Sequence, residues 1–161
     1  MFFYHSPIGF LQVGLSDKGL TSLQFVEQGG NDVLADELKG MQEEVVRNLD
    51  AYFEKPNWKW TCPVDFSTAT SFQKKVWSAL LEIPVGEVMS YQQIAELIEQ
   101  PKAAQAVGNA NAQNPVLLLV PCHRVIGSDG SLVGYRGELW RKEWLLKHEG
   151  YRGLSQQLNL F

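Results

Sequence analysis

Three side chains that can do chemistry follow one another at Cys122, His123 and Arg124, directly after Pro121. A cysteine attacks as a thiolate, which a nearby cation or hydrogen-bond donor stabilises. His123 and Arg124 are candidates for that stabilisation, and Glu149 is a carboxylate that could hold the imidazole in one tautomer. The triplet is equally compatible with a buried, unreactive cysteine, because a free cysteine commonly fills apolar space.

The apolar run Val116–Val120 predicts a buried strand that ends at Pro121. Because neighbouring residues of a strand point to opposite faces, we expect His123 to reach the sulfur of Cys122 only through a bend or a bridging water. Two cysteines and three scattered histidines lack the spacing of a zinc site, so no metal is expected. A cysteine hydrolase is a further alternative, although no hydrolase signature supports it.

The segment before the cysteine predicts two helices joined by a short connection. Ser90, with Gln93 three residues later, has the pattern of a capping box for a helix that runs through Ile98. Pro101 fits the first turn of a second helix that continues to Ala112. The pair forms a helix-turn-helix pattern, which DNA-binding proteins share with others. The small side chains of the second helix favour either close approach to a partner surface or tight packing in the core.

The remaining elements follow from periodicity and turn residues. Strands are expected in the runs 2–15, 20–26 and 58–66. Helices are expected over 31–53, 71–81 and 138–148. Gly150 is placed to end the last helix.

Composition limits the class of protein. With 161 residues, 45% of them hydrophobic, the chain can form one domain or two small ones. It has no apolar run of the roughly 20 residues that span a bilayer and no signal-peptide pattern, so a cytoplasmic or nuclear location is expected, and we predict the cytoplasm. Residues 1–66 carry five basic and ten acidic residues, whereas 67–161 carry nine and eight. Contact with phosphate is therefore expected only in the second part.

Several blocks together resemble the O6-alkylguanine-DNA alkyltransferases. They are PCHRV (121–125), GEVMSYQQIA (86–95), PKAAQAVGNA (101–110), Asn114-Pro115 and KEWLLKHE (142–149). The resemblance covers residues 65–150, and residues 1–66 match more weakly through SPIGFL. A chance match to all these blocks in order is improbable, so the resemblance favours a reactive Cys122 over a structural one.

The resemblance implies an α+β fold. It places a small ribonuclease H-like α/β domain at 1–66, a helical domain with a winged helix-turn-helix-like unit at 67–150, and a tail at 151–161. It implies DNA repair by a methylated-DNA–protein-cysteine S-methyltransferase that needs no cofactor and no metal. This monomer would bind the minor groove of double-stranded DNA containing O6-alkylguanine, away from any membrane. It would flip the base out, take a methyl or small alkyl group onto Cys122, and thereby inactivate itself.

The resemblance also assigns roles to single residues. Cys122 would accept the alkyl group, and His123, oriented by Glu149, would take its proton through a water. Asn114 would brace the turn around the cysteine, and Tyr91 would donate to guanine N3. The guanine pocket would be formed by Val125, Val133, Gly134, Tyr135, Arg136 and Gly137. DNA would contact Lys102, Ala104, Gln105, Gly108, Asn109 and Asn111.

Gln105 departs from the family pattern, which usually has an arginine there to fill the gap left by the rotated base. Glutamine is shorter and neutral, so DNA affinity or base rotation is expected to be weaker. The family also includes non-catalytic lesion-recognition proteins that flip alkylated bases and flag them for other machinery. Gln105 keeps this alternative open, while the presence of Cys122 argues against it.

Overall fold

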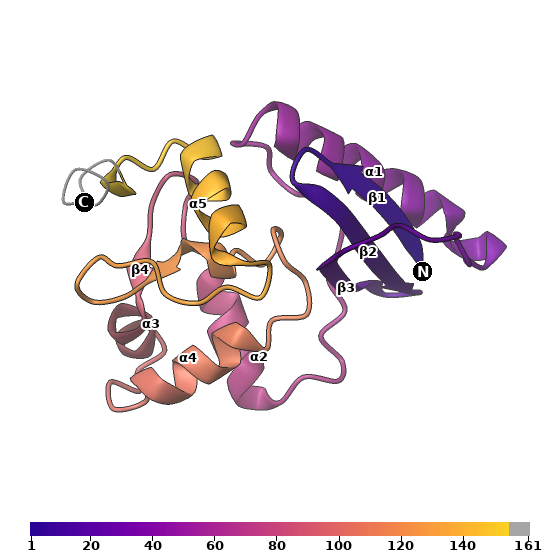
Figure 1. The fold of residues 1–161 in the computed structure, drawn as a ribbon. Helices are drawn as coiled ribbons and strands as arrows, with labels where there is room; N and C mark the ends of the chain where they lie inside the picture. The colour runs from indigo at the N-terminus through magenta and orange to yellow at the C-terminus, as the bar shows by residue number, and fades with distance from the viewer. Residues whose placement is uncertain (155–161) are drawn as a thin grey trace. The chain divides into compact units, whose positions relative to one another are not determined.

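Three antiparallel strands open the chain, and their order in the sheet follows the sequence: β1 (Phe2–Ser6), β2 (Gly9–Ser16) and β3 (Gly19–Val26). The predicted run 2–15 is therefore two strands of a hairpin. Ser6 closes its turn, since its hydroxyl donates to the Gly9 carbonyl at 2.7 Å and accepts from the Ile8 N–H at 3.2 Å. The computed structural model describes residues 1–154, whose strands and helices are labelled in Figure 1.

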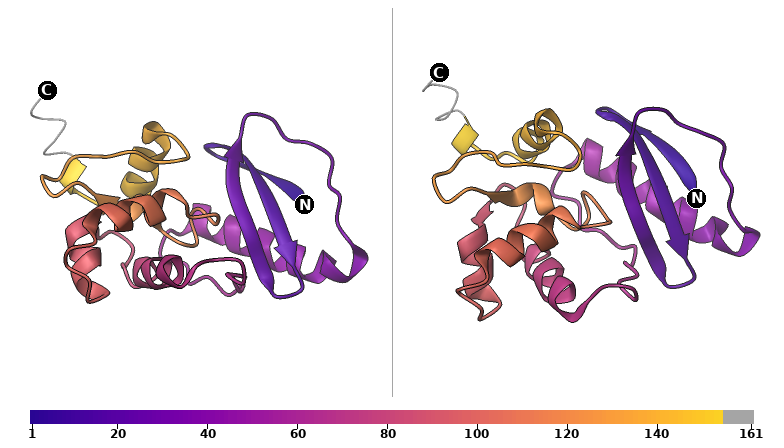
Figure 2. Two further views of the ribbon diagram at one scale, coloured as in Figure 1. Left: turned by 90° about the horizontal axis from the view of Figure 1, so that it is seen from below. Right: turned by 60° about the horizontal axis from the view of Figure 1, so that its bottom comes forward.

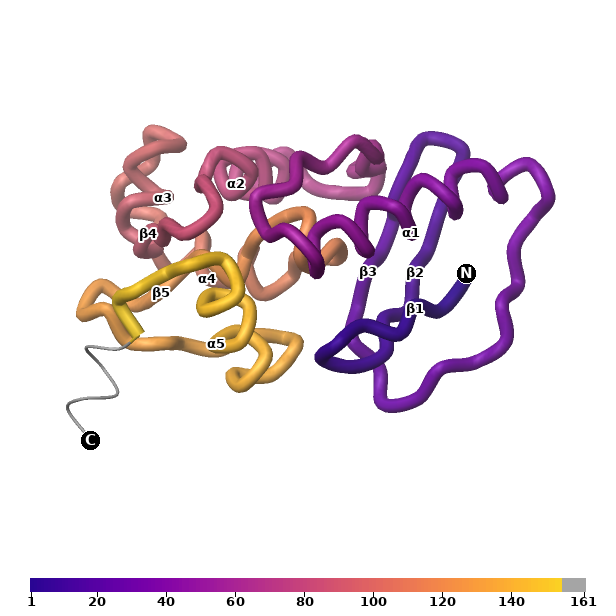
Figure 3. Tube along the Cα trace, turned by 90° about the horizontal axis from the view of Figure 1, so that it is seen from above, coloured from indigo at the N-terminus to yellow at the C-terminus, as the bar shows by residue number. Residues whose placement is uncertain are grey.

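Helix α1 (Lys39–Glu54) crosses one face of this sheet, as Figures 1 and 3 show. Its buried side chains, Val45, Leu49 and Tyr52, repeat at helical spacing and supply the core of this unit. The predicted start at residue 31 is wrong. A short 3₁₀ helix, η1 (Asp36–Leu38), comes first, and the chain before it is bonded to the N-terminal strand instead: the Val33 N–H donates to the Met1 carbonyl at 2.9 Å.

The predicted strand over 58–66 is also wrong. Only Val64 forms a bridge, which is parallel to Leu20. The preceding segment is held by a side chain, because the Asn48 carbonyl oxygen accepts from the Trp58 indole N–H at 3.0 Å and from the Thr61 backbone N–H at 2.8 Å. Before residue 63, this anchoring by a helix side chain takes the place of strand pairing.

From residue 68 to residue 150, the chain has four α-helices: α2 (Ser71–Leu80), α3 (Tyr91–Leu97), α4 (Ala104–Ala112) and α5 (Leu139–His148). The capping box predicted for Ser90 and Gln93 is confirmed, and Thr70 with Gln73 forms a second one before α2. Helix α4 begins later than predicted, because Pro101 lies in the turn that precedes it. Helices α3 and α4 lie side by side in both views of Figure 2.

The predicted strand over Val116–Val120 is wrong, and this error bears on the site. Val116 forms a single bridge to Leu23, after which the chain turns, with Leu118 at a φ of 70°. The Asn114 side-chain amide donates to the Val120 carbonyl at 2.8 Å and closes this turn. Its apolar residues are therefore buried as part of a loop that folds back on itself, and not as part of a sheet.

The described chain packs as two units, 1–67 with 115–117, and 68–114 with 118–154. A short parallel pair lies in the second unit, where β4 (Met89–Ser90) is bonded to β5 (Val125–Ile126). The α+β class is confirmed: a small sheet with one helix, followed by a mainly helical unit. The predicted tail, 151–161, lies outside the described residues from 155 onward. Within 1–154, no helix is both long and apolar enough to cross a membrane.

Candidate functional site around Cys122

Cys122 begins a short 3₁₀ helix, η2 (Cys122–Arg124), that leads directly into β5. The turn is closed by two backbone bonds, from the Cys122 N–H to the Val120 carbonyl at 2.8 Å and from the Arg124 N–H to the Pro121 carbonyl at 2.9 Å. Consecutive residues of a 3₁₀ helix lie about a third of a turn apart. Cys122 and His123 therefore do not alternate as in a strand, and they lie in a bend after Pro121, which is one of the two possibilities that the sequence analysis allowed.

Glu149, at the end of α5, lies between the two residues that follow the cysteine. Its Oε2 is 2.8 Å from the His123 Nε2. Arg124 donates to both carboxylate oxygens, from Nε at 2.8 Å and from Nη2 at 3.0 Å, and from Nη1 to the Ile83 carbonyl at 2.7 Å. The predicted His123–Glu149 contact is thus present, and Arg124 has a structural role that the sequence did not assign.

Burial and charge fix the protonation states of this cluster. Burial opposes ionisation of Glu149, but the hydrogen bonds from His123 and Arg124 and the charge of the Arg124 guanidinium outweigh it and hold the Glu149 pKa well below its usual range. Burial lowers the pKa of His123, so its imidazole is neutral at pH 7 despite the neighbouring carboxylate. A neutral imidazole carries one proton, and an ionised carboxylate only accepts. The proton therefore lies on Nε2, and Nδ1 is left as a buried acceptor with no partner among residues 1–154.

The Cys122 thiol is protonated in the free protein. Burial raises its pKa to about 11, and the Asn114 side chain, Lys142 and Arg136 oppose this in part. The sequence analysis named His123 and Arg124 as candidates to stabilise the thiolate. The positive charges that lower the Cys122 pKa are instead those of Lys142 and Arg136. Reaction at neutral pH then requires a base, and the residue next to Cys122 has a buried ring nitrogen, His123 Nδ1, with no partner among residues 1–154.

Lys142 is a residue of the site that the sequence analysis missed. It lies on α5 with no exposed surface, and its ammonium donates to the carbonyls of Val125 at 2.6 Å and Val133 at 2.8 Å. It therefore ties the strand after the cysteine to the loop that walls the cavity. Burial lowers its pKa to about 8. A lysine within an amphipathic helix is expected at the surface, so nothing in the pattern marked it as buried.

A cavity of about 330 Å³ opens beside the sulfur of Cys122. This volume is within the range of about 300–1,000 Å³ that is typical of small-molecule sites. Its lining comes from α3, α4, η2 and the loop before α5: Tyr91, Gly108, Asn111, Ala112, Cys122, Gly134, Tyr135 and Arg136. Burial raises the Tyr91 pKa, so this phenol is a neutral donor. Arg136 is the one charged residue of the lining.

The predicted pocket residues divide into two groups. Gly134, Tyr135 and Arg136 line the cavity, and the Tyr135 hydroxyl is buried without a partner among residues 1–154. Val125, Val133 and Gly137 are not in its lining. The first two supply the carbonyls that hold Lys142, while the Gly137 carbonyl accepts from Arg141 Nη1 at 3.1 Å.

The residues predicted to contact DNA also fall into two groups, those exposed on the surface and those that line the cavity. Lys102, Gln105 and Asn109 are exposed, and Ala104 is half-buried on the same helix region. Gly108 is half-buried and lines the cavity. Asn111 is only 6% exposed and lines the cavity instead of facing outward. The exposed positions of α4 are therefore two amides, Gln105 and Asn109, and two alanines, and none of them is charged.

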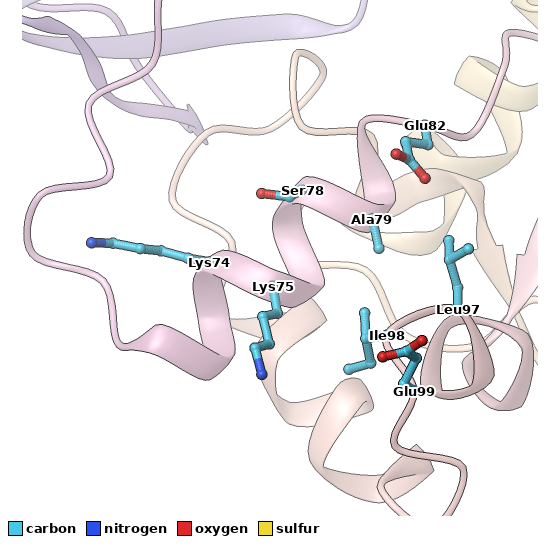
Figure 4. Close-up of a pocket in the computed structure, with 8 residues that line it drawn as sticks. All are labelled: Lys74, Lys75, Ser78, Ala79, Glu82, Leu97, Ile98 and Glu99. Carbon is cyan, nitrogen blue, oxygen red and sulfur yellow. The ribbon is translucent and has the colours of Figure 1, made fainter.

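A second, larger hollow of about 630 Å³ lies between α2 and the end of α3 (Figure 4). Its charged side chains are two lysines and two glutamates, and no cysteine, histidine or tyrosine lines it. Within 1–154, no group of three or more histidine, cysteine, aspartate or glutamate side chains could hold a metal ion. The buried thiol and the histidine that follows it lie at the smaller cavity, that of Cys122.

Two family models match the chain. Residues 71–151 match the 6-O-methylguanine DNA methyltransferase DNA-binding domain, and residues 2–66 match the ribonuclease-like domain of the same proteins. Together these two matches extend over nearly the whole described chain.

Similar proteins carry the same description. A methylated-DNA–protein-cysteine methyltransferase of Mycobacterium leprae is 45% identical over 158 residues, covering 97% of this chain and 94% of its own. One from Methanosarcina barkeri is 44% identical, covering 89% and 92%. Among solved structures, the Mycobacterium tuberculosis OGT in complex with DNA superposes with a TM-score of 0.79 at 39% identity, covering 95% and 96%.

We predict that the resting cysteine reacts slowly with small electrophiles and more rapidly as the pH rises. Because the Cys122 pKa is raised to about 11, the thiolate fraction should grow about tenfold per pH unit from pH 7 to 9. The measurement is the rate of iodoacetamide alkylation without DNA, in a Cys62→Ser background that removes the other cysteine. A rate that levels off below pH 9 would contradict the buried, protonated thiol.

Proposed function

The chain belongs to the 6-O-methylguanine DNA methyltransferase family, and we propose that it repairs DNA by direct transfer of an alkyl group to Cys122. The substrate is double-stranded DNA in which guanine O6 carries a methyl or other small alkyl group. The reaction makes the protein a methylated-DNA–protein-cysteine S-methyltransferase. A cytoplasmic location, where thiols stay reduced, fits a working cysteine.

One observation carries this proposal: the Cys122 sulfur is buried yet forms part of a cavity wall. A structural cysteine packs against neighbours on all sides and has no cavity beside it. The cavity wall also holds a neutral phenol, a guanidinium and an amide, which suit the polar edge of a purine. A base inside a duplex cannot reach such a cavity, so the damaged guanine has to be flipped out of the stack.

The neighbouring residues supply a base for the thiol. His123 is neutral and Nε2 donates to Glu149, so Nδ1 can accept the thiol proton through a water. The Glu149 charge stabilises the imidazolium that forms, and Arg124 prevents the carboxylate from turning away. This is the division of labour in which a carboxylate orients a histidine base.

The transfer exchanges one bond for another. A sulfur lone pair attacks the alkyl carbon, the carbon–sulfur bond forms, and the carbon–O6 bond breaks with its electron pair passing to guanine. Charge develops on the leaving base, where a donor such as the Tyr91 hydroxyl stabilises it. The product is a thioether, from which no side chain of the site can remove the alkyl group. Each molecule therefore reacts once, without cofactor or metal.

DNA contact is assigned to the exposed positions of the helix-turn-helix, α3 and α4. Lys102 lies just before α4, and Gln105 and Asn109 lie one turn apart on its exposed face. Gly108, next to Tyr91, has no side chain to keep the DNA backbone away from the mouth of the cavity. The low charge of this face predicts modest affinity for undamaged DNA and a shallow salt dependence.

The direct test is a mass measurement after incubation with duplex DNA that contains one O6-methylguanine. We expect one methyl group per protein molecule, on the peptide that contains Cys122, and guanine restored in the DNA. Cys122→Ser should abolish transfer, whereas Cys62→Ser, which changes the other buried cysteine, should retain it.

Two results would contradict this proposal. One is methyl transfer that persists in the Cys122→Ser variant. The other is tight binding of the lesion by the unaltered protein with no covalent product, which is the behaviour of a lesion-recognition protein.

A second prediction concerns Gln105, which is exposed on α4, the helix to which the proposal assigns DNA contact. Gln105→Arg adds a positive charge and a longer side chain, so binding to lesion-containing DNA should tighten on the order of threefold to tenfold. The salt dependence of binding should become steeper at the same time. Lys74→Arg, which keeps the charge on the separate α2 surface, serves as the control. Unchanged affinity in Gln105→Arg would place this residue outside the interface.

A further inference from the structure

Arg136 lies in the loop between β5 and α5 and lines the cavity beside Cys122, but the mechanism above gives it no role. It is the one charged side chain of the lining, and it is exposed to solvent, so it lies where the cavity opens. Its guanidinium has five N–H donors. Among residues 1–154, no carboxylate pairs with it, and its hydrogen bond from Nη1 to the Asn114 carbonyl is long, at 3.5 Å. Most of its donors are therefore available to a bound molecule.

The Arg136 guanidinium lies on the side of the cavity where the sulfur is. Asn114, whose carbonyl it contacts, also holds the cysteine, because the Asn114 side chain hydrogen-bonds the Cys122 sulfur and donates to the Val120 carbonyl at 2.8 Å. The charge of Arg136 also acts on the sulfur itself, since it lowers the Cys122 pKa. A group held next to the sulfur therefore lies near this guanidinium.

The alkyl group of the substrate has to occupy this side of the cavity. For a displacement, the attacked carbon lies about 3–3.5 Å from the sulfur, in line with the bond to O6. A methyl group has no further heavy atoms. In a longer group, the second carbon and its substituents branch away from that line, into the space beside the sulfur. A substituent that points toward the open side of the cavity then meets Arg136.

An anionic substituent needs a cation at this place, because a carboxylate taken out of water is costly unless it is paired. Tyr91, Tyr135 and Asn111 line the cavity with neutral phenol and amide groups. Lys142 is not part of the lining, and its ammonium is bound to two backbone carbonyls. Arg136 is thus the lining residue that can neutralise a carboxylate, and its planar fork can bond both oxygens.

We infer that Arg136 extends the substrates to guanines whose O6 alkyl group carries a carboxylate, of which O6-carboxymethylguanine is the smallest, by pairing with that carboxylate beside the sulfur. This inference deepens the proposed function and rests on it. The same bonds are exchanged. The carbon–sulfur bond forms, the carbon–O6 bond breaks with its electron pair passing to guanine, and the thiol proton passes to His123. Exchange with water then neutralises the imidazolium and the guanine, and the carboxylate stays ionised on the group now bound to Cys122.

The test compares two lesions of equal size that differ in charge. Single-turnover rate constants are measured on duplexes with O6-carboxymethylguanine and with O6-(carbamoylmethyl)guanine, its neutral amide. The ratio of the two constants, carboxylate over amide, should fall about tenfold in Arg136→Gln, the effect expected from losing a charge-assisted hydrogen bond. Arg136→Lys keeps the charge and should keep most of the ratio. Lys74→Gln, which removes a positive charge from the exposed surface of α2, should leave the ratio unchanged.

The salt dependence of the same ratio is a second readout. An ion pair at the open side of a cavity is partly screened by salt. The ratio of the unaltered protein should therefore decline as NaCl is added, while that of Arg136→Gln stays constant. A purely structural role of Arg136 would change both rate constants together and leave the ratio independent of salt.

The outcomes separate the inference from the proposed function. If the unaltered protein transfers no methyl group from O6-methylguanine, the proposed function fails. If it transfers methyl but not carboxymethyl, or if Arg136→Gln keeps the ratio of the unaltered protein, the role of Arg136 is overturned. Slower reaction with both lesions at an unchanged ratio would overturn it in favour of a contact with a DNA phosphate. Thermal unfolding confirms the folding of each variant, and the salt dependence of the unaltered protein keeps the test should the glutamine variant not fold.

Discussion

The site depends on one buried carboxylate, that of Glu149, held between His123 and Arg124. An isolated carboxylate in this position would be strongly unfavourable, and the Arg124 guanidinium, bound to both oxygens, is what makes it tolerable. The Ile83 carbonyl in turn holds the guanidinium in place. As a result the end of α5, the 3₁₀ turn after Pro121 and the loop before α3 are joined through side chains. Removing one partner of such a pair leaves an uncompensated charge, so the cluster is retained or lost as a unit.

A reactive cysteine must be inert at rest and yet be activated when its substrate is bound, and the same cluster gives these two tasks to different groups. The thiol stays protonated and inert in the resting protein, because burial raises its pKa to about 11. In the proposed mechanism, the base that activates it is prepared beforehand, because Glu149 fixes the proton on Nε2 and leaves Nδ1 free. A protein that reacts once and is then spent gains from this arrangement, since a resting thiolate would be consumed by other electrophiles. Lys142 adds a cation near the sulfur and ties the cavity wall in place.

Sequence patterns correctly predicted the elements whose hydrogen bonds and packing involve residues close together in the chain. The Ser90–Gln93 capping box fixed the start of α3, and the apolar spacing of α2 and α5 gave helices close to their observed bounds. The predictions were wrong where contacts with residues distant in the sequence determine the local structure. Val116–Val120 has the composition of a strand, but the Asn114 amide and a bridge to Leu23 fold it into a turn. Likewise, no periodicity could show that Lys142 is buried under two carbonyls or that Asn111 faces the cavity.

The central claim is that Glu149 holds His123 neutral, with its proton on Nε2 and with Nδ1 ready to receive the thiol proton. It is tested most directly by the nitrogen NMR spectrum of the His123 ring, recorded on the free protein from pH 6 to 8. The account predicts a protonated Nε2 and an unprotonated Nδ1 throughout this range. A doubly protonated ring at pH 7, or a proton on Nδ1, would contradict it.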